Sequence, residues 1–154
     1  MNFDELYRDV ILDHHQHPRG AAPIGKCNAD ASGLNPTCGD DVTVKFMIDD
    51  DKVVDVEIKG HGCAISTAAG SMFAERVKGM HLADLKSLTQ TLRTLLKTGE
   101  VPSDLDLGDL EALAGVSRFP IRVKCAMLPL ATAEQAISVF EERRANAVTV
   151  NTEG

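Results

Sequence analysis

The sequence has no long run of uncharged apolar residues, which excludes a segment long enough to span a membrane. Its first residues, Met1 to Glu5, also lack the positive start and the apolar stretch of a secretory signal. Hydrophobic residues make up 44% of the chain and charged residues 25%, as in ordinary globular proteins. We therefore expect a cytoplasmic protein without a membrane partner.

Basic side chains are scarce as well. Sixteen Lys and Arg stand against 23 Asp and Glu, the net charge is −7, and no stretch concentrates the basic residues. A nucleic-acid-binding surface needs such a concentration because it must neutralise a row of phosphates. We therefore expect no nucleic acid partner.

Internal repeats and low-complexity segments are also absent from the sequence. Its 154 residues fall within the usual length of one domain. We predict a single domain over residues 1–154, with a loosely ordered C-terminal tail from about residue 145.

Apolar residues recur at helical spacing in several parts of the chain. The first such segment follows Asn2, a residue type that caps helix N-termini, and Gly99 and Pro102 end a Leu-rich one. The predicted helical segments are 2–15, 65–77, 83–97, 107–113 and 122–144.

Strict alternation of apolar and polar residues predicts two strands, 42–48 and 54–58, joined by three aspartates into a hairpin with one buried face. A further short strand is expected near 27–32. Strands followed by helices indicate an α+β domain, in which a small antiparallel sheet packs against several helices.

The chain has four cysteines, Cys27, Cys38, Cys63 and Cys125. Without an export signal they are expected to be reduced, which favours metal binding or catalysis over disulfides. No spacing between them forms the paired Cys-x-x-Cys of a zinc ribbon. Any shared site must therefore be assembled by the fold.

Three of these thiols lie where predicted elements begin or end. Gly39 separates Cys38 from Asp40, and a glycine can place both side chains toward one point. Cys63 follows Gly-His-Gly at a helix start, where exposed amides stabilise a thiolate, and Cys125 lies near the start of the last helix. Three cysteines and one aspartate would complete a tetrahedral zinc shell.

Other residues of metal-binding type are expected to have ordinary roles. Cys27 lies outside these motifs, and we expect it to pack within the fold. Three histidines at the end of the first helix are expected to cap carbonyl groups or contact solvent rather than bind metal. They are His14, His15 and His17. His61 is likewise not expected to be a ligand.

Three short segments, each around one cysteine, resemble the motifs of the IscU/SufU (NifU N-terminal-like) family of iron–sulfur cluster assembly proteins. The segments are Asn35 to Asp40, Gly60 to Ser66 and Arg122 to Ala126. Leu6 through Arg19 adds to the match, which spans nearly the whole chain. The resemblance implies an IscU/SufU-like fold.

Within that family the chain is similar to the SufU branch. IscU scaffolds carry a histidine just before the third cysteine, where this chain has Lys124, and a Leu-Pro-Pro-Val-Lys motif that residues 118–122 do not reproduce. An apparent insertion around 82–110 is also SufU-like. SufU-type proteins are zinc-dependent sulfur acceptors that act with a SufS-type cysteine desulfurase.

The resemblance implies a role for each candidate residue. The implied zinc ligands are Cys38, Asp40, Cys63 and Cys125. Cys38 matches the sulfur acceptor, which a histidine of the desulfurase is thought to release from the metal. Because these ligands carry more negative charge than zinc neutralises, we expect Arg122 and Lys124 to lie beside them or to contact the partner.

Three alternatives remain open. The same residues could assemble a [2Fe–2S] cluster, as on an IscU scaffold acting with other iron–sulfur assembly proteins, because thiolates ligate iron as well. A hydrolytic zinc enzyme would need an open coordination position and a general base, and neither glycine motif contains a Glu. A purely structural zinc site would be required for folding but would trap no sulfur.

Overall fold

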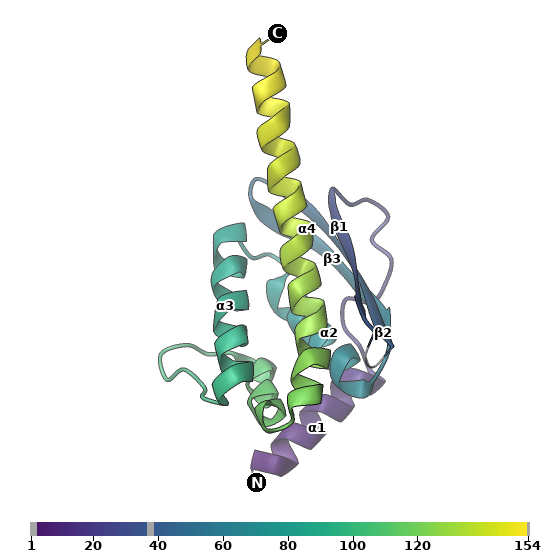
Figure 1. The fold of residues 1–154 in the computed structure, drawn as a ribbon, viewed down its shortest axis with the longest axis vertical. Coiled ribbons are helices and arrows are strands. Elements are labelled where there is room, and N and C mark those ends of the chain that lie inside the picture. The colour runs from purple at the N-terminus through teal and green to yellow at the C-terminus, as the bar shows by residue number, and fades with distance from the viewer. Residues whose placement is uncertain (1–2, 37–38, 154) are drawn as a thin grey trace.

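The computed structural model describes residues 3–36 and 39–153, with side chains for 7–36 and 39–146. The chain begins with helix α1 and a three-stranded sheet, and the remaining helices follow (Figure 1). The elements in order are α1 (Phe3–Gln16), β1 (Ala29–Asn35), β2 (Asp40–Asp49), β3 (Lys52–His61), α2 (Ala64–Val77), α3 (Leu82–Thr98), the 3₁₀ helix η1 (Gly108–Arg118) and α4 (Pro120–Glu153). The predicted α+β class is confirmed.

The sheet is antiparallel in the order β1-β2-β3. Its β2–β3 turn holds Asp50 and Asp51 at φ 52° and 58°, left-handed values that Asp tolerates better than most residues. Alternation along β2 buries four apolar side chains on one face. They are Val42, Val44, Phe46 and Ile48.

Helices α2 and α4 cover that buried face. α4 packs on β1 and β2, and α2 packs on β3 (Figure 1). α1 lies against α2 and η1, and α3 lies against η1 and α4. The starts of β2, α2 and α4 are therefore the parts of the fold that bear on the predicted site.

Most predicted elements are confirmed, and the differences lie at their ends. β1 begins at Ala29 and continues to Asn35, beyond the predicted strand. η1 is longer than predicted, and α4 begins at Pro120, which the first turn of a helix tolerates because proline has no N–H to lose there. α4 also continues past the expected end at Arg144 and projects from the rest of the molecule (Figure 1).

None of the helices in the described part of the chain is long and apolar enough to cross a membrane.

The packing of β1 on α4 depends on Gly33. A Cβ added at Gly33 would overlap the hydroxyl of Thr132 and lie 3.1 Å from Leu128 Cδ1. We expect Gly33→Ala to lower the free energy of unfolding by about 1–3 kcal/mol because it overpacks this contact. Urea denaturation would measure the loss, and Ser32→Ala, at an exposed neighbouring position, should change little.

The companion variant Thr132→Ala removes the hydroxyl that the new methyl group would meet. In the double variant most of the lost stability should return. Equal losses in Gly33→Ala with and without Thr132→Ala would show that this contact does not set the spacing between β1 and α4.

Candidate metal centre

Asp40 is the first residue of β2, and its carboxylate is almost fully buried, at 1% exposure. It pairs with Asn35 across the turn that joins β1 and β2. Gly39, just before it, has φ 73°, in the left-handed region that favours glycine. Asp40 begins the alternation of buried residues along β2, so its side chain lies on the buried face of the sheet.

Cys63 is the N-cap residue of α2. Its amide N–H donates to Asp40 Oδ1 at 2.9 Å, and its Sγ lies 3.6 Å from Asp40 Oδ2. Sγ also accepts from the amide of Ser66 at 3.5 Å. Cys63 therefore lies at the start of a helix, as the sequence predicted.

Two glycines allow the end of β3 to reach this carboxylate. A Cβ on Gly62 would overlap Asp40 Oδ1 and lie 2.6 Å from its Cγ. A Cβ on Gly60 would overlap the carbonyl oxygen of Asp41. The bond between Asp40 and Cys63 therefore requires the Gly-His-Gly sequence that precedes the cysteine.

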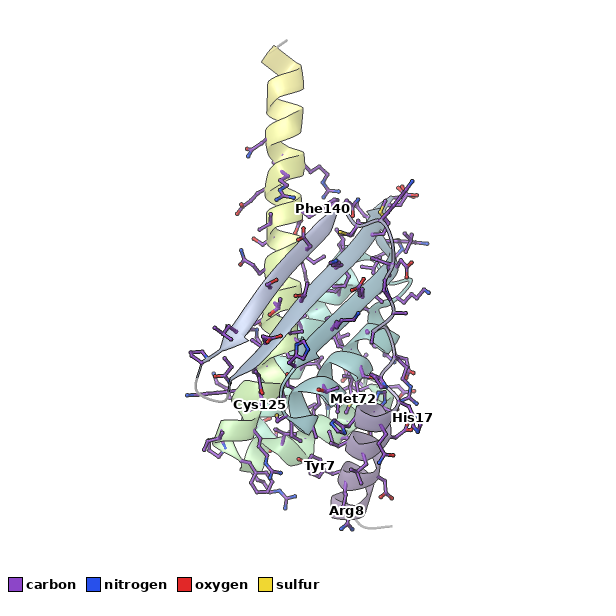
Figure 2. The ribbon with its side chains drawn as sticks, turned by 90° about the vertical axis from the view of Figure 1, so that its right-hand side faces the viewer. Tyr7, Arg8, His17, Met72, Cys125 and Phe140 are labelled. Atoms are coloured by element: carbon purple, nitrogen blue, oxygen red, sulfur yellow. The ribbon has the colours of Figure 1, made fainter. Side chains whose placement is uncertain are left out.

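Cys125 brings a second thiol to the same point from α4. Its side chain is 3% exposed, and it lies in the part of the molecule that also holds Tyr7 and Arg8 (Figure 2). Single ligand atoms of Asp40, Cys63 and Cys125 all lie within 4.8 Å of one another. The structure thus brings together three of the four predicted ligands.

The fourth predicted ligand, Cys38, lies outside the described residues. It precedes Asp40 by two positions in the sequence. The set that the structure does describe, two thiols and a carboxylate, fits the donor preferences of zinc.

A groove of about 770 Å³ opens beside the two thiols. α1 supplies one wall, the junction between η1 and α4 supplies the other, and the start of α2 also contributes to the lining. Its lining includes Tyr7, Arg8, Ile11, Leu12, Cys63, Arg118, Phe119, Ile121, Arg122 and Cys125. Ile121 is 68% exposed, and Leu12 and Phe119 are also exposed. The groove therefore combines an open apolar surface with access to both thiols.

Arginines frame this apolar surface. The guanidinium groups of Arg118 and Arg122 lie 5.7 and 5.1 Å from the centre of the Phe119 ring. Such stacking orients a guanidinium over the ring face. Arg122 thus lies on the groove, and Lys124 is exposed on the first turns of α4. The hydrogen bonds found for Asp40 and Cys63 among the described residues do not involve Arg122 or Lys124.

Cys27 and the histidines His15, His17 and His61 lie at the surface. The prediction that Cys27 packs within the fold is wrong, because its side chain is exposed before β1 begins. His15 and His17 are exposed as expected. His61 is exposed too, with Nδ1 3.4 Å from Asp41 Oδ1.

His14 differs from the expectation that it caps carbonyls or contacts solvent. It is fully buried, with Nδ1 2.7 Å from Ser71 Oγ and Nε2 2.8 Å from Asp109 Oδ2. Sequence analysis missed this cluster, although His14 continues the apolar stripe of α1. The order Ser-His-Asp would suit a nucleophilic hydrolase, but Ser71 is 3% exposed and accepts from the amide of Arg19, which disfavours a role as an attacking nucleophile.

Arg19 borders this histidine cluster. Its guanidinium donates to Asp13 at 2.8 Å and lies 3.4 Å from Glu75. The hydrogen bond from Arg19 lowers the pKa of the Asp13 carboxyl below its ordinary value. The positive charge of Arg19 is therefore already paired with the carboxylates of Asp13 and Glu75.

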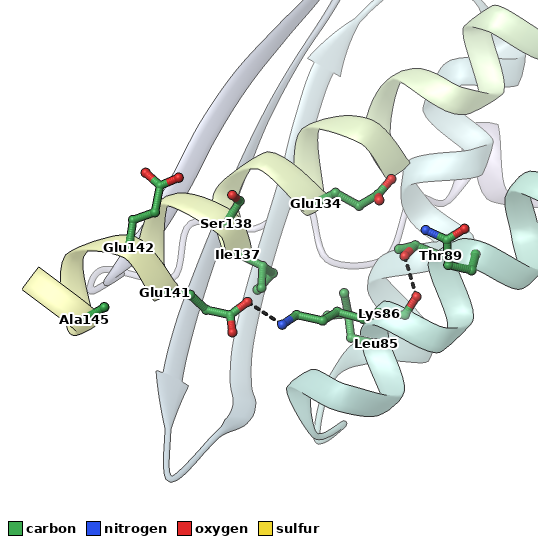
Figure 3. Close-up of a pocket in the computed structure, with 10 residues that line it drawn as sticks. Leu85, Lys86, Thr89, Glu134, Ile137, Ser138, Glu141, Glu142 and Ala145 are labelled. Carbon is green, nitrogen blue, oxygen red and sulfur yellow. Dashed lines mark hydrogen bonds and ion pairs between the residues drawn. The ribbon is translucent and has the colours of Figure 1, made fainter.

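A second hollow, of about 590 Å³, lies between α3 and α4 (Figure 3). Several of its polar groups are already engaged in bonds. Lys86 Nζ lies 2.5 Å from Glu141, and Thr89 donates to the carbonyl of Lys86. This hollow contains none of the predicted ligands. The groove beside Cys63 and Cys125 is therefore the better candidate for the functional site.

Comparison with known proteins agrees with this geometry. Residues 6–126 match the family described as NifU-like N terminal domain. The zinc-dependent sulfurtransferase SufU of Bacillus subtilis is 37% identical over 140 residues, covering 91% of this chain and 95% of that protein. The iron–sulfur cluster assembly scaffold protein IscU of Streptococcus pyogenes is 35% identical over 144 residues, covering 94% and 87%.

Solved structures show the same fold. A proposed iron–sulfur cluster assembly scaffold protein for the SUF system from Fervidobacterium islandicum superposes with a TM-score of 0.78 at 32% identity, covering 86% of this chain and 96% of that one. A NifU-like protein from Brucella abortus, at 22% identity, gives a TM-score of 0.81 over 90% and 96% of the two chains. The chain therefore belongs to the NifU-like N-terminal domain family, together with the proteins named SufU and IscU.

Proposed function

We propose that this chain is a zinc-dependent sulfur carrier for iron–sulfur cluster assembly, which accepts persulfide sulfur from a SufS-type cysteine desulfurase. The observation that carries the proposal is the convergence of Asp40, Cys63 and Cys125 within 4.8 Å beside an open groove. The 37% identity to a relative named as a zinc-dependent sulfurtransferase supports the same reading.

The residues proposed to hold the zinc are Cys38, Asp40, Cys63 and Cys125. Bound zinc would keep the thiols deprotonated, whereas a free thiol with a pKa of about 8.5 is mostly protonated at neutral pH. Asp40 is fixed by the Cys63 amide, and Cys63 is further stabilised by the start of α2. The chain itself thus pre-orients two of these donors.

Cys38 is the proposed sulfur acceptor. Its thiolate attacks the outer sulfur of the persulfide on the desulfurase cysteine, and a new S–S bond forms at Cys38. The S–S bond of the donor breaks, and the desulfurase cysteine leaves as a thiolate. The transferred sulfur changes carriers without any external oxidant or reductant.

The groove is the proposed docking surface for the desulfurase. Exposed apolar side chains such as Phe119 and Ile121 offer surface that a partner can remove from water. Arg8, Arg118 and Arg122 add positive charge to a chain whose net charge is −7. We expect acidic side chains on the partner to meet these arginines, with Lys124 adding to the same positive surface.

A second candidate function is assembly of a [2Fe–2S] cluster on the same ligands. The 35% identity to a relative named as an IscU scaffold favours it, and thiolates ligate iron as well as zinc. Lys124, in the place of the histidine of IscU scaffolds, favours the carrier. Anaerobic reconstitution with ferrous iron and sulfide separates the two, because only a scaffold yields a stable cluster that transfers to an acceptor protein.

Purified protein should contain one zinc per chain. Gly62→Ala should weaken zinc binding roughly tenfold or more, because the added methyl group would displace the Asp40 carboxylate. Competition with a chromogenic chelator would measure the zinc affinity of each variant. His61→Ala, at the exposed neighbouring side chain, is the matched control and should retain zinc as the unmodified chain does. Normal zinc affinity in Gly62→Ala would contradict Asp40 ligation.

Cys38→Ala should abolish sulfur acceptance, because the attacking thiolate is removed. The measurement is incubation with desulfurase and cysteine, followed by mass spectrometry for one added sulfur atom on the chain. Cys27→Ala removes an exposed thiol outside the site and should accept sulfur normally. A Cys38→Ala protein that still becomes persulfidated and stimulates the desulfurase would refute the acceptor role.

Arg122→Glu should raise the concentration of this protein that half-saturates the desulfurase by at least about fivefold, because it places a negative charge on the groove. The difference from the unmodified chain should shrink as salt is added. Lys97→Glu, in the last turn of α3, makes the same charge change outside the groove and should have little effect. Equal behaviour of the two variants would argue against docking at the groove.

A further inference from the structure

The buried imidazole of His14 has no place in the chemistry proposed above, yet both of its nitrogens are engaged. Nδ1 lies 2.7 Å from Ser71 Oγ, and Nε2 lies 2.8 Å from Asp109 Oδ2. The ring itself is 0% exposed. A buried polar ring with two such bonds holds its neighbours firmly, because breaking either bond leaves a polar atom without water.

Ser71 belongs to the same network. The amide of Arg19 donates to Ser71 Oγ at 2.8 Å, and the hydroxyl keeps a hydrogen and a second acceptor site for the bond with His14 Nδ1. Nε2–H donates to the Asp109 carboxylate. Because an ionised carboxylate only accepts, this bond places a proton on Nε2.

The three elements joined by His14 each contribute residues to the groove, whose remaining lining comes from Cys63, Phe119 and the start of α4. His14 lies on α1, which forms one wall. Ser71 lies on α2, whose N-cap is Cys63. Asp109 lies at the start of η1, and only Phe119 separates the end of η1 from the start of α4. His14 therefore links one groove wall to the helix that carries Cys63 and to the segment that leads into Cys125.

Metal binding explains this cluster less well. His14, Glu75 and Asp109 offer ligand atoms within 4.8 Å of one another. However, the Arg19 guanidinium lies 3.4 Å from Glu75, so an added cation would meet a positive charge already in place. Hydrogen bonding accounts for the described geometry without a metal.

We propose that the His14–Asp109 hydrogen bond is a clamp that sets the spacing of the two groove walls and so determines how tightly the desulfurase docks. His14 and Asp109 are positioning residues, since neither lines the groove nor belongs to the proposed ligand set. The inference rests on the proposed function for its partner, the desulfurase. It adds a residue pair that acts on docking rather than on sulfur chemistry.

The test uses Asp109 because its side chain is 48% exposed and its removal should leave the fold intact. Asp109→Ala deletes the acceptor, whereas Asp109→Asn keeps an amide oxygen that can accept from Nε2–H. Calorimetric titration of the desulfurase should show roughly three- to tenfold weaker docking for Asp109→Ala and near-normal docking for Asp109→Asn. Zinc content and the maximal rate of sulfur transfer at saturation should stay unchanged in both.

Two control variants separate a clamp from general loss of stability. Glu111→Ala removes another carboxylate of η1, one that takes no part in the His14 network, and should dock normally. Gly33→Ala is expected to destabilise the contact between β1 and α4, away from the clamp. If Gly33→Ala weakens docking as much as Asp109→Ala does, the clamp is refuted.

The other possible outcomes distinguish failure of the clamp from failure of the sulfur-carrier proposal. Unchanged docking of Asp109→Ala, or equal losses in Asp109→Ala and Asp109→Asn, would overturn the clamp while leaving the sulfur-carrier proposal intact. If the unmodified chain docks but accepts no sulfur, the carrier proposal fails, and weaker docking of Asp109→Ala alone would still support the clamp. If the unmodified chain does not dock at all, both proposals fall.

Discussion

The candidate metal centre depends on one hydrogen bond, from the Cys63 amide to the Asp40 carboxylate at 2.9 Å. It joins the first residue of β2 to the N-cap of α2, so sheet and helix meet at the ligands. A buried carboxylate is tolerated only when it is hydrogen-bonded, and the start of a helix offers both an amide donor and a favourable dipole. Gly62 leaves room for this contact, since any larger residue would overlap the carboxylate.

The surroundings of this centre combine protection with access. Cys125 is buried and Cys63 is half-buried, yet both line a groove whose far surface carries exposed apolar groups. A buried thiol next to an open apolar surface suits chemistry that begins when another protein covers the groove, because docking then excludes water from the reacting sulfurs. The network around His14 lies behind that surface and ties its walls together, so the shape of the groove does not depend on the ligands alone.

The periodic segments of the sequence were predicted well because their apolar spacing is local. The β2–β3 hairpin, the helix after Cys63 and the Leu-rich α3 all follow from it. The predictions failed where packing between residues distant in sequence determines whether a side chain is buried. Cys27 is exposed because β1 begins only at Ala29, and nothing near Cys27 in sequence indicates which side of the chain faces solvent. The burial of His14 depends on Ser71 and Asp109, which lie 57 and 95 positions away.

The amino-acid sequence supplies the chemical groups and their local settings: cysteines beside glycines, one aspartate two positions after Cys38, and a cysteine placed to begin a helix. These features are local, since glycine freedom and helix capping involve only neighbouring residues. The meeting of Asp40, Cys63 and Cys125 within 4.8 Å follows from long-range packing, because β2, α2 and α4 bring these residues together. The groove and the His14 network have the same origin, since both are built by side chains that the sequence separates and packing of the helices brings into contact.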